Sequence, residues 1–204
     1  MKSYFPQNIP SDPITFFGSW FRIADKTEHI QYAGAMCLST VNAKGRPRGR
    51  IVLLHHYGVE GFDFMTDQRS DKGCELENNP FAALTFYWAP LELQVRIEGK
   101  VFKGSDEVSD TYFNERPRRS KVTAWASAQS SETKSRDELK KEIRKWNDKF
   151  GKTAAIKRPA YWQAYRLKPD RMEFWEARSR RLHNRVCYTW NAEDQNWSYR
   201  WLQP

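Results

Sequence analysis

The sequence has 204 residues, with 34 lysines and arginines against 25 acidic residues, so its formal net charge at pH 7 is +9. No apolar run approaches the ~18 residues that a membrane-spanning helix needs, which excludes an integral membrane protein. Aromatic residues make up 15% of the chain, too many rings for an intrinsically disordered protein.

Cysteine usage and the N-terminal residues bear on the cellular compartment. The three cysteines, Cys37, Cys74 and Cys187, are widely spaced and form no metal-ligand pair. The first residues lack the apolar core of a secretory signal. We therefore expect a cytoplasmic protein without disulfides.

The excess of basic over acidic residues has two ordinary explanations: a surface that binds nucleic acid or membrane, or a site for anionic small molecules. Basic residues concentrate in two short segments, 116–121 and 178–181, rather than in a tail. This pattern favours discrete anion pockets, and we expect neither a nucleic-acid nor a membrane partner.

The first half of the chain is predicted to form one helix followed by strands, with a second, short helix among them. Ser11-Asp12-Pro13 supplies an N-cap and a proline for a helix to about residue 26. Residues 35–41 form a strand, and residues 50–55 a largely apolar strand that we expect to be buried on both faces. Ser70 caps a short helix over 72–77. The remaining strands of this half are predicted at 62–66, 81–88 and 91–102.

The second half begins with helices and returns to strands. Helices are predicted over 105–115, 120–129 and 135–150, the last with a capping box of Ser135 and Glu138. After a loop at 152–159, strands are predicted at 161–167, 171–175, 185–190 and 197–202. The expected fold is mainly β, a barrel or sandwich with peripheral helices, in one domain spanning residues 1–204.

Common catalytic motifs are absent from the sequence. It contains no dinucleotide-binding, phosphate-loop, serine-hydrolase or zinc-protease signature, and its four histidines are scattered, so no metal site is expected. What remains is polar residues at strand ends and in loops: Arg50, Gln94, Gln129-Ser130 and the segment 181–185. Each alone could be a strand-edge charge, a satisfied amide or a turn.

In combination, these segments resemble the pyridoxine/pyridoxamine 5′-phosphate oxidase family. The most specific segment is Met172-Glu173-Phe174-Trp175 followed by Arg181-Leu182-His183-Asn184-Arg185, and the resemblance runs from about Asp12 to Pro204. It implies an FMN-binding split β-barrel that forms a homodimer with FMN at the subunit interface. It also implies that residues 160–204 form the C-terminal strands and that residues 1–12, with Lys2-Ser3-Tyr4, form a shortened substrate lid.

The resemblance also implies roles for individual residues. The implied cofactor contacts are Arg50, Ile51, Val52, Leu53, Leu54, Met65, Thr66, Lys72, Gln94, Gln129, Ser130, Trp175 and Arg185. The implied substrate contacts are His55, Tyr112, Arg116, Ser120, Arg181 and His183, of which Arg181 and His183 are the catalytic candidates that assist proton movement. Arg50 and Arg185 adjoin apolar or aromatic strands, where a charge needs an anionic partner, and we expect FMN to provide it.

Three residues depart from the family pattern. His55 replaces the usual lysine at the substrate phosphate, Asp71 replaces an arginine beside the FMN phosphate, and Asn184 replaces an aspartate. Asp71 is the most disruptive, because a carboxylate repels a phosphate, and Arg69 is a candidate to compensate.

Three functions remain open. The first is oxidation of pyridoxamine 5′-phosphate or pyridoxine 5′-phosphate to pyridoxal 5′-phosphate, with FMN as cofactor and O2 as electron acceptor. The second is a related FMN-dependent oxidase acting on a phenazine precursor. The third is a flavin- or pyridoxal-phosphate-binding protein without turnover.

Overall fold

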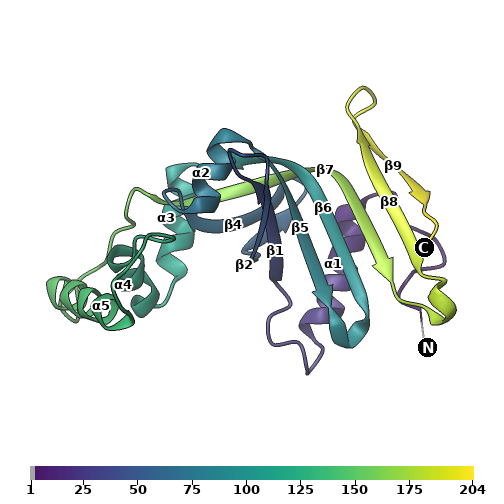
Figure 1. The fold of residues 1–204 in the computed structure, drawn as a ribbon. Helices are drawn as coiled ribbons and strands as arrows, with labels where there is room; N and C mark the ends of the chain where they lie inside the picture. Colours follow the sequence, from purple (N-terminus) through teal and green to yellow (C-terminus); the bar gives the residue numbers. More distant parts are fainter. Residues whose placement is uncertain (1–2) are drawn as a thin grey trace.

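A computed structural model describes residues 3–204, and it contains nearly all the elements that the sequence predicts (Figure 1). Its strands are β1 (Ala35–Val41), β2 (Pro47–Leu53), β3 (His56–Gly58), β4 (Gly61–Asp67), β5 (Phe81–Trp88), β6 (Leu93–Lys103), β7 (Trp162–Glu176), β8 (Asn184–Asn191) and β9 (Asn196–Trp201). Its α-helices are α1 (Pro13–Asp25), α2 (Asp71–Asn78), α3 (Asp106–Glu115), α4 (Arg118–Ala126) and α5 (Arg136–Phe150). The 3₁₀ turns η1 (Ala89–Leu91) and η2 (Ser179–Arg181) precede β6 and β8.

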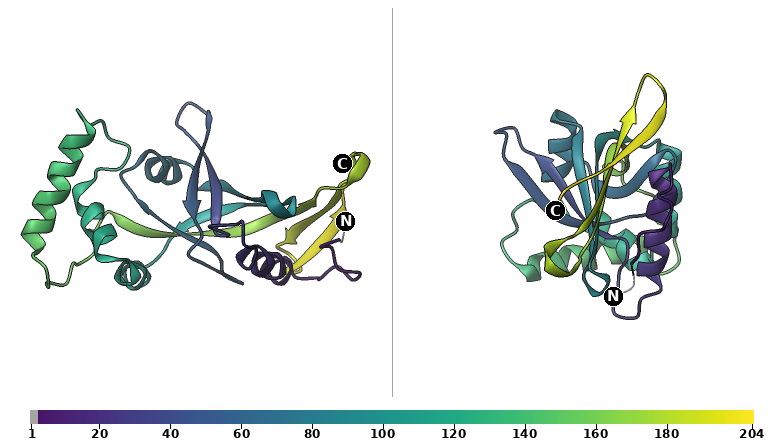
Figure 2. Two further views of the ribbon diagram at one scale, coloured as in Figure 1. Left: turned by 90° about the horizontal axis from the view of Figure 1, so that it is seen from below. Right: turned by 90° about the vertical axis from the view of Figure 1, so that its right-hand side faces the viewer.

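All strands of the described residues join one curled antiparallel sheet, in the order β2-β1-β5-β6-β7-β4-β3, with β8 and β9 added beside β7. The long strand β7 organises this sheet. One edge of β7 pairs with β6 from Tyr165 to Glu176, while the other edge pairs first with β4 and then with β8. The helices α4 and α5 therefore lie at one end of the molecule and the β8–β9 hairpin at the opposite end (Figures 1 and 2).

The prediction of two separate strands at 161–167 and 171–175 is wrong, because β7 continues through Pro169. Pro169 lies opposite Gly99, where the register of β6 shifts between Glu98 and Gly99. A β-bulge tolerates proline, which has no N–H to donate to the ladder. A side chain at Gly99 would collide with the carbonyl oxygen of Lys168, so the close approach of the two strands requires glycine there.

The expectation that the apolar strand at 50–55 is buried on both faces is also wrong. β2 is an edge strand that pairs only with β1. The side chains of Ile51 and Leu53 are 69% and 55% exposed. An apolar sequence predicts burial, but here no other part of residues 3–204 covers this face of β2. The strand leaves an open apolar surface, which is typical of a binding site or an interface.

Two hydrophobic clusters hold the fold together. In the larger cluster, α1 buries Phe16, Phe17 and Trp20 against the sheet, and Phe16 stacks on Phe174 at 4.2 Å between ring centroids. The predicted cap of α1 is confirmed, since the Asp12 carboxylate accepts hydrogen bonds from the backbone N–H groups of the first turn. The smaller cluster lies under α3, α4 and α5, with the members Phe113, Val122, Ile156 and Trp162.

Truncating Phe174 should be among the most destabilising changes in the larger cluster. Phe174 is fully buried, and removing a buried phenyl ring costs about 3–5 kcal/mol because a cavity remains. Chemical denaturation of Phe174→Ala measures the loss in the free energy of unfolding. Phe81, which is 58% exposed on β5, provides the control. Equal losses for Phe174→Ala and Phe81→Ala would contradict the assigned packing.

Candidate active site

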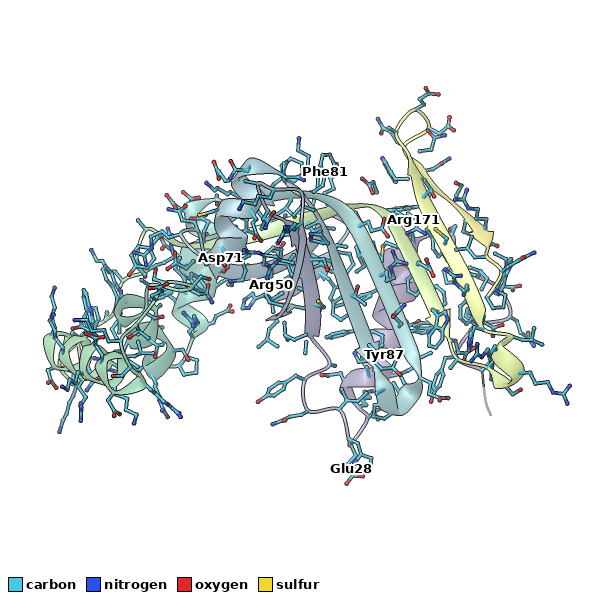
Figure 3. The ribbon with its side chains drawn as sticks, in the orientation of Figure 1. Glu28, Arg50, Asp71, Phe81, Tyr87 and Arg171 are labelled. Atoms are coloured by element: carbon cyan, nitrogen blue, oxygen red, sulfur yellow. The ribbon has the colours of Figure 1, made fainter. Side chains whose placement is uncertain are left out.

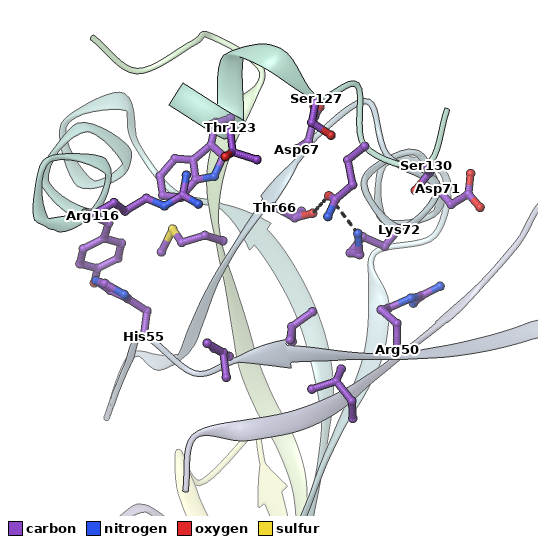
Figure 4. Close-up of a pocket in the computed structure, with 18 of the residues that line it drawn as sticks. Arg50, His55, Thr66, Asp67, Asp71, Lys72, Arg116, Thr123, Ser127 and Ser130 are labelled. Atoms are coloured by element: carbon purple, nitrogen blue, oxygen red, sulfur yellow. Dashed lines mark hydrogen bonds between the residues drawn. The ribbon is translucent and has the colours of Figure 1, made fainter. Parts of the chain in front are cut away.

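A cavity of about 830 Å³ lies between β2, β4 and the helices α2, α3 and α4 (Figure 4). The residues with implied cofactor or substrate roles that line it are Arg50, Ile51, Val52, Leu53, Leu54, His55, Met65, Thr66, Lys72, Tyr112, Arg116, Gln129 and Ser130. Further lining residues are Asp67, Asp71, Thr123, Ala124, Ser127 and Trp162. Of these, only Asp71 was expected from the sequence to lie beside a ligand. Helical spacing of Thr123 and Ser127, four residues apart, could have indicated a shared face of α4.

At one end of the cavity, three segments converge on the side-chain oxygen of Gln129. Lys72 on α2 donates to this oxygen at 3.1 Å, and Thr66 on β4 donates to it at 3.0 Å (Figure 4). The Lys72 ammonium also donates to the Ser70 hydroxyl at 3.3 Å. Lys72 is only 7% exposed, and burial, followed by the charge of nearby Arg50, lowers its pKa. The acceptors that hold this ammonium are thus neutral.

Arg50 lies beside Lys72, and its charge is compensated within the chain. Its guanidinium donates to Glu75 at 3.1 Å, to the Leu38 carbonyl at 3.2 Å and to the Thr40 hydroxyl. Glu75 is 6% exposed and also accepts a 2.5 Å hydrogen bond from Thr40. The premise that Arg50 lacks an anionic partner without FMN is therefore wrong.

Asp71, which replaces the family's arginine, is also paired. Arg48 on β2 forms a 2.8 Å ion pair with it, so the charge of this carboxylate is balanced at the mouth of the cavity. Figure 3 shows Asp71 and Arg50 close together between α2 and the β1–β2 hairpin. Arg69, the candidate for compensation, instead donates to Asp67 at 2.7 and 3.0 Å and lies over the Tyr161 ring.

The opposite end of the cavity contains Arg116 (Figure 4). Its backbone is the C-cap of α3, and its guanidinium lies 4.9 Å from the centre of the Trp162 ring. The Nη1 atom is buried and has no hydrogen-bond partner among residues 3–204. Burial lowers the pKa of Arg116. A buried guanidinium nitrogen without an acceptor marks a place where an anion would be stabilised.

His55 and Tyr112 flank Arg116, and each contacts a carboxylate. His55 Nε2 lies 3.0 Å from Glu115, and its ring centre lies 3.9 Å from that of Tyr112. The Tyr112 hydroxyl donates to Asp63 at 2.9 Å, and Arg166 holds the buried Asp63 through two hydrogen bonds of 2.6 and 2.8 Å. Burial, followed by the contact with Asp63, raises the pKa of Tyr112 to about 12. Asp63, Glu115 and Arg166 were not among the site residues expected from the sequence.

The folded protein should become less stable at alkaline pH because of two phenols, those of the partly buried Tyr112 and the buried Tyr165. The pKa values of Tyr112 and Tyr165 are each raised to about 12, whereas tyrosines of an unfolded chain ionise near pH 10. Between about pH 10 and 12 the two phenols have lost their protons in the unfolded state but keep them in the folded state. Their contribution to the free energy of unfolding is therefore full below pH 10 and is lost as the pH rises through 12.

Urea unfolding of the wild type and Tyr112→Phe across this pH range measures the decline. The variant should show a shallower slope, because it carries one fewer of these phenols. Tyr32→Phe, at an exposed position, is the control, and its slope should match that of the wild type. Identical slopes for all three proteins would show that Tyr112 titrates as in the unfolded chain.

The other predicted residues do not reach this cavity. Gln94, Trp175 and Arg185 lie opposite one another on β6, β7 and β8, and the His183 ring packs 4.8 Å from Trp175. Arg181 is exposed in η2 beside them. These residues form a second group near the C-terminal end of β7, whereas the cavity adjoins its N-terminal end. Ser120 lies in the first turn of α4 and does not line the cavity.

Arg185 in this second group also has a partner in the chain. It donates to the buried Glu173 at 2.6 and 3.0 Å, so the premise that it needs FMN as its anionic partner is wrong, as for Arg50. Within residues 3–204, no cluster of histidine, cysteine and acidic side chains could hold a metal ion, and no helix is long and apolar enough to cross a membrane.

Comparison with known proteins decides the family. Residues 25–150 match the family model described as pyridoxamine 5′-phosphate oxidase, and residues 162–204 match that described as the pyridoxine 5′-phosphate oxidase C-terminal dimerisation region. The chain belongs to the pyridoxine/pyridoxamine 5′-phosphate oxidase family. Members of this family are oxidoreductases, and the resemblance stated from sequence is confirmed.

Relatives in this family match nearly the whole chain. The pyridoxine/pyridoxamine 5′-phosphate oxidase of Chromohalobacter salexigens is 42% identical over 97% of this chain and 91% of its own length. The oxidase of the same name from Cupriavidus taiwanensis is 47% identical over 89% of this chain and 84% of its own length.

Two solved structures share the fold. PhzG from Burkholderia lata, solved in complex with tetrahydrophenazine-1-carboxylic acid, superposes with a TM-score of 0.88 at 30% identity, covering 96% of this chain and 94% of PhzG. A pyridoxamine 5′-phosphate oxidase-related, FMN-binding protein from Nostoc punctiforme superposes with a TM-score of 0.73 at 20% identity, covering 92% and 96% of the two chains. The predicted class, a mainly β split barrel with peripheral helices, is confirmed.

Proposed function

We propose that this oxidase uses FMN to convert pyridoxamine 5′-phosphate or pyridoxine 5′-phosphate into pyridoxal 5′-phosphate, with O2 as electron acceptor. The observation that carries the proposal is the arrangement of two cations at opposite ends of one cavity, the buried Lys72 and the half-buried Arg116. Lys72 is held by neutral acceptors, and Arg116 keeps a buried nitrogen without an acceptor. A cofactor and a substrate that each bear a phosphate would supply the two missing anions.

The residues around Lys72 fit FMN. Lys72 and Arg50 would hold its phosphate, and the apolar edge of β2 at Ile51 and Leu53 would lie against the flavin. Thr66 and Gln129 offer polar groups to the ring system. When bound, FMN would accept a hydride from the C4′ carbon of the substrate and pass the electrons to O2. The chain's own contribution is to orient the two molecules and to exclude water.

The residues around Arg116 fit the substrate phosphate. The Arg116 guanidinium would bind it directly, with help from His55 and Tyr112, which also line the cavity. Ser120, which lies outside the cavity lining, would have to move to take the role that the family resemblance implies for it. Because the Tyr112 hydroxyl donates a hydrogen bond to Asp63, this contact would require the hydroxyl to rotate toward the phosphate. Arg181 and His183 would lie against the pyridine ring and assist proton movement.

A second copy of the chain would complete the site. Gln94, Trp175, Arg181, His183 and Arg185 gather at the far end of β7 from the cavity of their own chain. A symmetric dimer could place them over the partner's cavity and cover the exposed apolar face of β2. The match of residues 162–204 to a dimerisation region supports this arrangement. Light scattering should therefore give twice the mass of one chain.

A phenazine-type substrate is the second candidate. It is favoured by the likeness to PhzG and by Glu115, whose carboxylate lies against His55 at the substrate end. The higher identity to the pyridoxine/pyridoxamine 5′-phosphate oxidases, 42–47% against 30%, favours the first candidate. A flavin- or pyridoxal-phosphate-binding protein without turnover is the third.

A visible spectrum followed by anaerobic titration separates these functions. Absorption bands of oxidised flavin in the purified protein, bleached by pyridoxamine 5′-phosphate, would support the proposed reaction. Bleaching by a reduced phenazine carboxylic acid alone would select the second function. A flavin spectrum that neither compound bleaches would select binding without turnover.

A further inference from the structure

A single buried carboxylate, Glu176 at the end of β7, gathers donors from three parts of the chain. Its side chain accepts hydrogen bonds from the Asn184 amide at 2.8 Å, the Ser3 hydroxyl at 3.0 Å and the Tyr4 backbone N–H at 2.5 Å. Arg178 Nε forms an ion pair with it at 3.1 Å. Glu176 is 2% exposed, and none of the roles implied by the family resemblance involves it.

Two of these donors bracket a strained loop. Arg178 precedes η2 and Asn184 follows it, while Arg180 and Arg181 between them have positive φ angles of 58° and 60°. Side chains other than glycine adopt this left-handed region at a cost in free energy, so the surrounding contacts must hold the loop in place. The side chains of Arg178 and Asn184 both contact the same Glu176 oxygen, Oε2.

The same contacts fix the orientation of His183. The backbone N–H of Arg178 donates to His183 Nδ1 at 3.1 Å, so Nδ1 is an acceptor and the proton of the neutral ring resides on Nε2. The ring is also packed against Trp175 at 4.8 Å. Glu176 thus acts on His183 through Arg178, whose side chain it holds.

We propose that Glu176 is a positioning residue that clamps the 178–184 loop, and with it Arg181 and His183, in the conformation used for catalysis. This proposal rests on the proposed function for its effect on turnover. The clamp also holds Ser3 and Tyr4, and the Tyr4 carbonyl in turn accepts a 3.1 Å hydrogen bond from the Trp20 indole. The start of the described chain and the loop therefore share one anchor. Lys2 of the motif Lys2-Ser3-Tyr4 lies outside the described residues.

The clamp explains why Asn184 stands where the family has aspartate. An amide can donate to the buried Glu176 carboxylate, whereas an aspartate at this position would place a second carboxylate against it. In this chain, residues 176 and 184 form one carboxylate–amide pair. Exchanging the two groups should preserve the pair, and changing either one alone should break it.

A double-mutant cycle tests the pair. Glu176→Gln and Asn184→Asp should each lower kcat about tenfold or more with FMN still bound, because small displacements of catalytic groups can cost up to ~100-fold in rate. The combined Glu176→Gln/Asn184→Asp protein should be about tenfold more active than the product of the single effects. Glu193→Gln, at the exposed turn between β8 and β9, is the matched control and should leave kcat unchanged.

Nitrogen-15 NMR of the histidine rings gives a readout that needs no substrate. In the wild type, His183 should show an unprotonated, hydrogen-bonded Nδ1, and this signature should be lost in Glu176→Ala and Asn184→Asp. An unchanged His183 signal in these variants, or strictly additive effects on kcat, would overturn the clamp. If these variants lose the His183 signature but the wild type has no oxidase activity, the clamp is supported and the proposed function is overturned.

Discussion

Replacing Arg116 by alanine is expected to raise the KM for pyridoxamine 5′-phosphate by about tenfold or more, with FMN still bound. The guanidinium lies over Trp162, and its Nη1 is buried and has no acceptor among residues 3–204. A hydrogen bond between a charged donor and a phosphate contributes about 1.5–3 kcal/mol, which corresponds to this change in KM. His55 replaces a permanent cation there, so the phosphate depends more heavily on Arg116.

The alternative is that Arg116 only ends α3, where a cation is favourable in any case. A capping role would lower thermal stability modestly and leave KM unchanged. Arg119→Ala, on the exposed side of the next helix, controls for the loss of one positive charge. His55→Lys should lower KM, and more so in the Arg116→Ala background. An unchanged KM in Arg116→Ala would remove both the phosphate subsite and the substrate assignment.

Replacing Lys72 by methionine is expected to weaken FMN binding by about 10- to 100-fold, from the loss of a charge-assisted hydrogen bond. The same change should leave the cofactor-free protein as stable as the wild type or more so. The ammonium is 7% exposed and bound to neutral acceptors, so its burial costs free energy until an anion arrives. These opposite effects distinguish a ligand-binding lysine from a structural one.

Fluorescence titration with FMN measures the affinity, and thermal denaturation of the cofactor-free protein measures stability. Lys44→Met, in the exposed turn between β1 and β2, is the control for the loss of charge. A Lys72→Met protein that is less stable without cofactor and binds FMN as tightly as the wild type would show that Lys72 serves the fold.

Sequence predicts those parts of this fold that depend on local interactions. The bounds of β1 and β5 match the predicted strands, and Ser70 and Ser135 cap the helices assigned to them. The continuity of β7 through Pro169 could not be predicted, because it depends on a bulge in the pairing of β7 with β6, at which Asp170 has no opposite residue. The exposure of β2 could not be predicted either, since an apolar strand has the same sequence pattern whether its own chain or another molecule covers it.

The candidate site shows the same division. Residues that belong to contiguous motifs, such as 50–55 and 129–130, were found and line the cavity. The carboxylate partners of Arg50 and Tyr112 were missed, because Glu75 and Asp63 approach them from other elements and follow no short-range spacing. The expectation that Arg50 and Arg185 need a cofactor failed for this reason: sequence shows a charge, but only the tertiary structure shows what neutralises it.

The length of β7 has a genetic consequence. Its 15 residues extend over up to about 45 Å. Arg116 lies over Trp162, the first residue of the strand, and His183 packs against Trp175, near its last residue. If each cavity of the dimer contains residues of both subunits, Arg116→Ala and His183→Ala remove residues that different subunits contribute to the same site. Subunits of the two impaired proteins, mixed and allowed to exchange, would form hybrid dimers in which one of the two cavities is intact. Random pairing would then restore roughly a quarter of the wild-type sites, so two alleles that each impair every site would partly complement one another within a single cell.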